Sequence, residues 1–117
     1  MIRGIGVDMV DLARFERAIA KTPRLIERLF DASERDATVR TLAGRFAAKE
    51  AFIKAIGDPR GLRWSEVRIA SDQLGKPSIS TAGAAAARLQ DFGINQIHLS
   101  ITHDAGIACA FVVAEGN

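Results

Sequence analysis

The sequence predicts an α+β domain in which an antiparallel sheet packs against a layer of helices. Three patterns carry this prediction: apolar residues alternate at the start of the chain, a long helical pattern fills the middle, and alternating segments dominate the second half. A length of 117 residues suits one domain over residues 1–117. We therefore expect a single hydrophobic core between one sheet and its helices.

The opening residues, Arg3 to Met9, are expected to form a strand because their apolar side chains alternate. Ile5, Val7 and Met9 share one face, and Gly4, Gly6 and Asp8 share the other. Glycine inside a strand often marks a place where something approaches the backbone closely. Asp8, on the face of the two glycines, either ends the strand and supports the next helix cap, or it binds a ligand.

Short helices are expected next, each opened by a residue that can cap it or start it. Their lengths suit a layer that packs on the sheet. They run from a cap at Asp11 to about Lys21, from Thr22-Pro23 through Phe30, and over a further turn that starts at Ser33.

A long helix is expected from Leu42 to Ile56, where Gly57 ends it. Small or apolar residues cover almost all of its surface, so the helix should be well buried. Lys49 falls inside the apolar stripe, whereas Glu50 and Lys54 share a flank. Because an unpaired buried charge costs several kcal/mol or more, these few charges need partners.

The second half of the chain switches to strands. Asp72 to Gly75 is a plausible hairpin turn, and Thr81 is expected to cap an alanine-rich helix that reaches about Phe92 and stops at Gly93. The last strand is apolar on both faces, so the fold or another subunit must cover both. The expected strands are Glu66 to Ala70, Lys76 to Ser80, Gln96 to Thr102 and Ile107 to Ala114, with Trp64 near the start of the first.

Asp8 and Glu50 are the carboxylates that suggest a metal and phosphate site. They come from separate elements that also carry cations, and Mg²⁺ commonly takes one or two carboxylates together with waters and substrate phosphates. Nearby Lys and Arg residues would neutralise the remaining phosphate charge. The simpler alternative for Glu50 is a surface ion pair with Lys54, worth only about 0.3–0.5 kcal/mol. A dry helix fits that alternative less well.

Composition narrows the function further. The net charge is +2 and the pI is about 9.1, with most Lys and Arg residues between Arg3 and Arg63, which hints at an anionic partner. Nucleic acid is the least favoured partner, because there is no Tyr and no basic-aromatic motif. A single cysteine, Cys109, excludes a disulfide framework and fits a reducing cytoplasm. No apolar run approaches the ~18 residues of a membrane span, and the N-terminus shows no cleavable leader.

Three segments carry a family resemblance. Gly4 to Asp11, Gly44 to Ala55 and Ser100 to Asp104 resemble, in order and spacing, the three motifs of the carrier-protein synthases of the 4′-phosphopantetheinyl transferase superfamily. The central segment, Gly-Arg-Phe-Ala-Ala-Lys-Glu-Ala-Phe-Ile-Lys-Ala, is the most specific. Gly75-Lys76-Pro77 also matches, so the resemblance covers essentially the whole chain.

The resemblance implies a 4′-phosphopantetheinyl transferase-like fold and a magnesium-dependent transfer from coenzyme A to a serine of an apo acyl carrier protein. It implies that Asp8 and Glu50 bind Mg²⁺ with the coenzyme A pyrophosphate, that Lys54 lies at the transferred phosphates, and that Glu50, or a water it holds, is the base. It further implies a homotrimer with active sites between subunits. The matching positions expected around the nucleotide are Arg45, Lys49, Lys76 and His103.

The first helix carries a basic stripe opposite its apolar residues. A solvated face of an amphipathic helix would explain the stripe, but acyl carrier proteins are acidic and such a stripe would steer them in. We favour carrier recognition at Arg14, Arg17 and Lys21, with Arg24 and Arg28 as further contacts.

The main alternative to a transferase is a non-catalytic protein that binds acidic carrier proteins or nucleotides. In such a protein Asp8, Glu50 and Lys54 would have little reason to persist together. A nucleic-acid-binding protein is a third possibility that rests on the pI alone.

Overall fold

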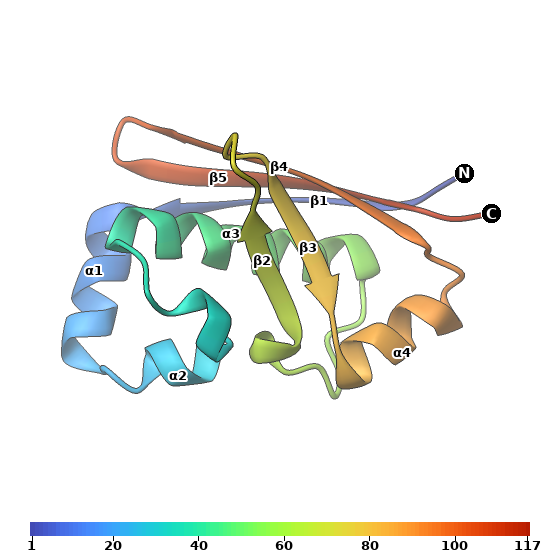
Figure 1. Ribbon diagram of the computed structural model, residues 1–117, viewed down its shortest axis with the longest axis horizontal. Helices are drawn as coiled ribbons and strands as arrows, with labels where there is room; N and C mark the ends of the chain where they lie inside the picture. The colour runs from blue at the N-terminus through green and yellow to red at the C-terminus, as the bar shows by residue number, and fades with distance from the viewer.

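Two antiparallel sheets and a set of helices make up the computed structural model, which describes residues 1–117 (Figure 1). The larger sheet has three strands in the order β1-β5-β4, and the smaller sheet is the β2–β3 hairpin. The predicted α+β class is confirmed, with its strands divided between two sheets. The strands are β1 (Ile2–Asp11), β2 (Val67–Ser71), β3 (Pro77–Thr81), β4 (Gln96–Asp104) and β5 (Ile107–Glu115).

The longest helix lies beneath the three-stranded sheet and the shorter helices stand at its ends (Figure 1). None of them combines the length and the apolar composition that crossing a bilayer would require. The helices are α1 (Leu12–Lys21), α2 (Leu25–Leu29), α3 (Val39–Ile56) and α4 (Gly83–Asp91), with 3₁₀ turns η1 (Ala32–Glu34) and η2 (Trp64–Glu66).

Strand β1 and helix α3 approach each other more closely than ordinary side chains would allow. A Cβ atom added at Gly6 would come closer than 3.0 Å to the carbonyl oxygen of Ala51, and one at Gly4 would meet the carbonyl of Ala55 in the same way. Ala51 and Ala55 are themselves buried, so both surfaces are small. The glycines of β1 therefore do mark a close approach, and the approaching group is the helix backbone.

Helix α3 begins three residues before the predicted start at Leu42. The Thr38 side chain accepts a hydrogen bond from the amide of Thr41 at 3.2 Å and caps the first turn. At the other end Gly57 adopts φ +83°, where its lack of a Cβ allows the left-handed cap. The predicted end of the helix is confirmed.

Two predicted helix starts are wrong. Helix α2 begins at Leu25, because the Thr22 carbonyl accepts from the Leu25 amide in a preceding turn and no side chain caps the helix. Thr81 is the last residue of β3, where it pairs with Val67 in the ladder. The first turn of α4 is satisfied by Glu66, whose carboxylate accepts from the amide of Ala84 at 2.9 Å.

Smaller differences lie elsewhere. Trp64 belongs to the 3₁₀ turn η2 and packs against Phe46, so it does not open a strand. The residue that caps η1 is Asp31, one residue before the turn, whose side chain accepts from Ser33. Asp11 caps α1 as predicted, accepting from the amide of Arg14 at 2.9 Å.

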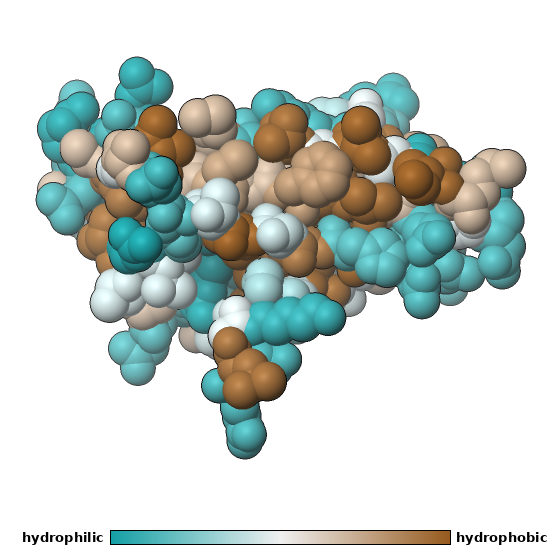
Figure 2. Space-filling model, turned by 90° about the horizontal axis from the view of Figure 1, so that it is seen from above, coloured by the Kyte–Doolittle hydropathy of each residue, from teal (hydrophilic) through white to brown (hydrophobic).

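The outer face of the three-stranded sheet is apolar and uncovered in the single chain. Ile5, Val7 and Met9 are 60%, 51% and 63% exposed, and Phe111 on the adjacent strand is 45% exposed. Seen from above, brown side chains gather along this face (Figure 2). The inner face of β5, which includes Ala110 and Val112, is buried. An exposed apolar face of this kind commonly marks an interaction surface.

Replacing Gly6 by Ala tests the close approach of β1 to α3. The added methyl group would meet the Ala51 carbonyl, so we expect the free energy of unfolding to fall by at least about 2 kcal/mol, measured by urea denaturation. Gly57→Ala is the control, because its Cβ meets no atom within 4 Å and only its positive φ is penalised, at about 1–2 kcal/mol. Equal stability of Gly6→Ala and the wild type would contradict the packing described here.

Candidate functional site

Asp8, Glu50 and Lys54 meet where β1 crosses α3. Asp8 follows the glycines on the inner face of β1, and Glu50 and Lys54 lie one turn apart on the helix. The Lys54 ammonium donates to Asp8 Oδ1 at 3.0 Å and to the Val7 carbonyl at 3.1 Å. The predicted alternative, an ion pair between Lys54 and Glu50, is wrong because Lys54 pairs with the strand carboxylate.

The two carboxylates lie in each other's electric field. Burial raises the pKa of Glu50 above its ordinary value, the negative charge of Asp8 raises this pKa further, and Lys54 opposes both effects. Two neighbouring carboxylates, only one of which is paired with an ammonium, form a site that favours additional positive charge. Lys54, at 3.0 Å from Asp8, supplies one positive charge at this position.

This donor set suits a magnesium ion that also binds a ligand. No group of three or more His, Cys, Asp or Glu side chains is arranged to hold a metal in this chain. A metal here would therefore have Asp8 and Glu50 as its protein ligands and would complete its coordination with ligand oxygens and water. Mg²⁺ is characteristically bound in that way, with one or two carboxylates plus phosphates.

A second set of predicted residues lines a cleft of about 210 Å³ between α3, β4 and the β2–β3 hairpin. Arg45, His103 and the backbone around Gly75 and Pro77 form its walls, and we refer to it as the hairpin cleft. Lys76 stands between these last two residues and is exposed. Three of the four residues expected around a nucleotide are therefore in or beside one cleft.

His103 reaches this cleft because Gly44 has no side chain. A Cβ at Gly44 would lie 2.9 Å from His103 Nε2, so any larger residue would push the ring away. His103 Nε2 is 2.9 Å from the Arg40 carbonyl, which can only accept, so Nε2 carries the hydrogen. The second ring nitrogen, Nδ1, is left for a ligand.

Lys49 lies elsewhere than the resemblance implies. Its side chain is fully buried, its ammonium donates to Glu34 Oε1 at 2.7 Å and to the Trp64 carbonyl at 2.9 Å, and it lies 5.0 Å from the Phe30 ring centroid. Burial lowers the pKa of Lys49, while Glu34 acts to raise it. The expectation that Lys49 faces a nucleotide does not match this position, because no part of its side chain reaches the surface.

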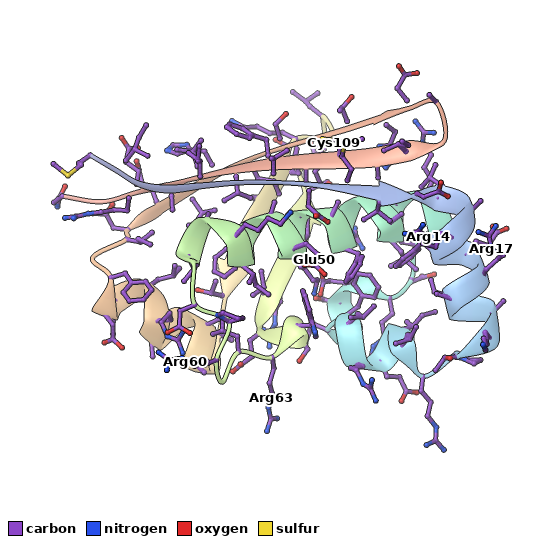
Figure 3. The ribbon with its side chains drawn as sticks, turned by 180° about the vertical axis from the view of Figure 1, so that it is seen from behind. Arg14, Arg17, Glu50, Arg60, Arg63 and Cys109 are labelled. Carbon is purple, nitrogen blue, oxygen red and sulfur yellow. The ribbon has the colours of Figure 1, made fainter.

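The basic residues of α1 border a third feature. A cleft of about 220 Å³ between α1, β1 and α3 is lined by Asp8, Arg14, Phe15 and Phe46 among others, and we call it the α1 cleft. Most of its lining is apolar, while Arg14 and Arg17 project from the helix into solvent (Figure 3). Lys21, Arg24 and Arg28 are also exposed.

The single chain does not join these features into one site. Asp8 lines the α1 cleft and Arg45 and His103 line the hairpin cleft, and no cleft of this chain is lined by residues of both sets. Sequence reasoning missed Glu34 and the role of Gly44. The signal for Glu34 was indirect: a lysine in an apolar stripe requires a buried carboxylate, but nothing in the sequence selects which one.

Comparisons with known proteins bear on this arrangement. Residues 4–112 match the model of the 4′-phosphopantetheinyl transferase superfamily. The chain is 53% identical over 117 residues to a holo-[acyl-carrier-protein] synthase of Clavibacter michiganensis, covering 100% of this chain and 98% of that one.

Solved structures agree with the sequence relatives. The holo-[acyl-carrier-protein] synthase of Neisseria meningitidis superposes with a TM-score of 0.88 at 37% identity, covering 98% of this chain and 99% of that one. The corresponding protein of Helicobacter pylori, solved in complex with coenzyme A, gives a TM-score of 0.84 at 31% identity and covers 95% and 99%.

The raised pKa of Glu50 predicts how this residue affects stability. Ionising a group whose pKa is higher in the folded state destabilises the fold; this penalty is absent below the unfolded value, near 4.5, and complete above the folded pKa. Glu50→Gln should therefore raise the melting temperature at pH 7.5, and the gain should vanish toward pH 4. Glu16→Gln, on the exposed surface of α1, is the control. A gain that is the same at both pH values would refute this account.

Proposed function

The chain belongs to the 4′-phosphopantetheinyl transferase superfamily, and from this premise we propose that it transfers the 4′-phosphopantetheine group of coenzyme A to a serine of apo acyl carrier protein. The products are the holo carrier protein and 3′,5′-ADP. The observation that carries the proposal is the meeting of Asp8, Glu50 and Lys54 at one point between β1 and α3. Phosphoryl transfer depends on positioned charge of this kind.

In this proposal Asp8 and Glu50 hold Mg²⁺. When bound, the ion would neutralise charge on the diphosphate of coenzyme A. The mutual repulsion of the two carboxylates, which contributes to the raised pKa of Glu50, supports the assignment. Lys54 remains 55% exposed while it contacts Asp8, so its ammonium is available to phosphate oxygens. Together these groups would meet the negative charge that develops during transfer.

The acceptor serine needs a base. Its hydroxyl oxygen forms the new bond to the β-phosphorus, the bond from that phosphorus to the oxygen of 3′,5′-ADP breaks, and the serine proton passes to Glu50 or to a water held by it. A pKa raised above the ordinary glutamate value moves Glu50 toward the pH at which a general base is most effective. No covalent intermediate on the enzyme is required.

The hairpin cleft is the proposed site of the nucleotide. Arg45 and the adjacent Lys76 give it a cationic lining that suits phosphate groups, and the His103 ring, held by the Arg40 carbonyl, forms part of its wall. Lys49 takes no direct part, because it is buried against Glu34. The nucleotide would then contact α3 on one side and the β2–β3 hairpin on the other.

We further propose a homotrimer with active sites between subunits. Two observations support it. The apolar outer face of the sheet is uncovered, and the group formed by Asp8, Glu50 and Lys54, which we call the Asp8 set, does not open into one cavity with the hairpin cleft within a chain. A neighbouring subunit could bring its own hairpin cleft to the Asp8 set. The cytoplasmic location expected from the single Cys109 stays a prediction.

The basic surface of α1 is the proposed docking site for the carrier protein. Arg14 borders the α1 cleft together with Asp8, so a carrier bound there would lie next to the proposed catalytic groups. The exposed arginines would attract an acidic partner, and the apolar lining that includes Phe15 would accept an apolar side chain from it. A non-catalytic carrier-binding protein would use the same surface but would not need Glu50.

A mass assay tests the transfer itself. Apo carrier protein incubated with coenzyme A and Mg²⁺ should gain the mass of a phosphopantetheine group, and chelation of the metal should abolish the gain. Glu50→Gln and Lys54→Ala should each slow the reaction by roughly 10²-fold or more, because each removes charge from the transition state. Full activity of Glu50→Gln would contradict the metal and base roles, and a wild type without transfer would favour the non-catalytic alternative.

Charge reversal tests the docking surface. Arg14→Glu should raise the KM for the carrier protein by roughly tenfold, with a weaker effect at high salt, and leave the KM for coenzyme A unchanged. Arg63→Glu is the matched control, since Arg63 lies on a loop far from Arg14 and Arg17 (Figure 3). An equal rise for both substrates, or an equal effect of the control, would be inconsistent with carrier docking on α1.

Sedimentation equilibrium tests the assembly. A trimer has three times the chain mass of 12.6 kDa, and Val7→Asp on the outer face should shift the protein toward the monomer because a charge there would be buried. A wild-type protein that sediments as a monomer at micromolar concentration would rule out the proposed assembly.

A further inference from the structure

Glu34 is a fully buried carboxylate that the proposed chemistry does not use. It is the last residue of the short turn η1 and is 1% exposed, and apart from Lys49 it is the only charged residue among the fully buried ones. Burial of a carboxylate is costly unless it is paired and hydrogen-bonded. The contacts of Glu34 therefore indicate its role in the structure.

Both carboxylate oxygens of Glu34 are occupied. Oε1 accepts from Lys49 Nζ at 2.7 Å and from the Asp31 amide at 2.9 Å, and Oε2 accepts from the Ile69 amide at 3.0 Å. Lys49 also donates to the Trp64 carbonyl at 2.9 Å. The Glu34 side chain thus joins three segments, η1, α3 and β2, and Lys49 adds the contact with η2.

Two of those segments are walls of the hairpin cleft. Ile69, whose amide Glu34 binds, lines the cleft from β2, and Arg45 lines it from α3. The Arg45 guanidinium donates through Nη1 to the main-chain carbonyl of Glu34 at 2.6 Å. Glu34 consequently contacts both walls, through its carboxylate on the β2 side and through its backbone on the Arg45 side.

Stability alone is a weak reason for such a pair. Replacing a buried ion pair by well-packed apolar residues is often neutral or stabilising, whereas removing one partner leaves an uncompensated charge. What an apolar pair could not reproduce is the hydrogen bond to the Ile69 amide, which holds β2 at a defined distance from α3. What the Glu34–Lys49 pair provides beyond stability is therefore a fixed spacing between the β2 and α3 walls of the cleft.

We propose that Glu34 is a positioning residue for nucleotide binding: with Lys49 it fixes the spacing of the hairpin cleft and the orientation of Arg45. This inference rests on the proposed function, which places the coenzyme A nucleotide in that cleft. It also gives a role to Lys49, which acts on the nucleotide through Glu34 and makes no contact of its own.

Calorimetric titration with coenzyme A tests the inference. In Glu34→Gln the amide nitrogen must face a donor, either Lys49 Nζ or the Ile69 amide, so the connection between the walls is broken. We expect the Kd for coenzyme A to rise at least roughly tenfold. The KM for the carrier protein and kcat at saturating coenzyme A should each stay within about twofold, a split that general destabilisation would not produce.

Glu66→Gln is the matched control. Glu66 also accepts from two main-chain amides, those of Arg63 at 3.1 Å and Ala84 at 2.9 Å, but it caps α4 and does not line the cleft. Its substitution should lower the melting temperature and leave the Kd for coenzyme A unchanged. A control that weakens coenzyme A binding as much as Glu34→Gln would overturn the positioning role.

A second variant separates positioning from folding. Glu34→Leu combined with Lys49→Met removes both buried charges, so this protein should fold, yet its Kd for coenzyme A should still rise roughly tenfold because the Ile69 contact is lost. Wild-type affinity in either folded variant would refute the inference while leaving the proposed function intact. A wild type that does not bind coenzyme A would overturn the proposed function, and the inference with it.

Discussion

The close contact of β1 with α3 is the constraint on which the rest of the molecule depends. Gly4 and Gly6 allow the helix carbonyls of Ala55 and Ala51 to approach the strand where any side chain would collide. This contact brings Asp8, two residues beyond Gly6, beside Glu50 and Lys54 on the helix. The two glycines therefore determine where the proposed functional side chains meet. A spacing wider by one methyl group would separate the carboxylates that we propose share a cation.

A second constraint acts on another side of the same helix. Lys49 points away from the Asp8 set and into the core, where Glu34 neutralises it and ties α3 to β2. One flank of α3 thus carries charges left accessible for a ligand, and the other carries a charge that organises the fold. The two roles alternate over a few residues of one helix, because successive side chains lie 100° apart around its axis.

Many of the helices and strands could be predicted from the sequence, because the spacing of apolar residues depends on local secondary structure. The strand at Arg3 to Met9, the helix that ends at Gly57 and the need of Lys49 for a partner all follow from patterns within a few residues. The misplaced helix starts at Thr22 and Thr81 have one cause, namely that a threonine before a helix can serve a turn or a strand ladder equally well. Glu34 could not be identified, since its pairing with Lys49 and Ile69 spans distant segments. The separation of the Asp8 set from the hairpin cleft is likewise a property of the folded chain alone.

Direct location of the cation is the most decisive measurement. Crystals grown with coenzyme A and Mn²⁺ in place of Mg²⁺ would show the metal by its anomalous scattering. Our account predicts a single site bound by an oxygen of Asp8, an oxygen of Glu50 and phosphate oxygens of coenzyme A, with metal–oxygen distances slightly longer than the ~2.0–2.1 Å typical of magnesium because Mn²⁺ is the larger ion. A metal ion that binds the phosphates but neither carboxylate, or only one of the two carboxylates, would contradict the central claim that a strand aspartate and a helix glutamate share one cation.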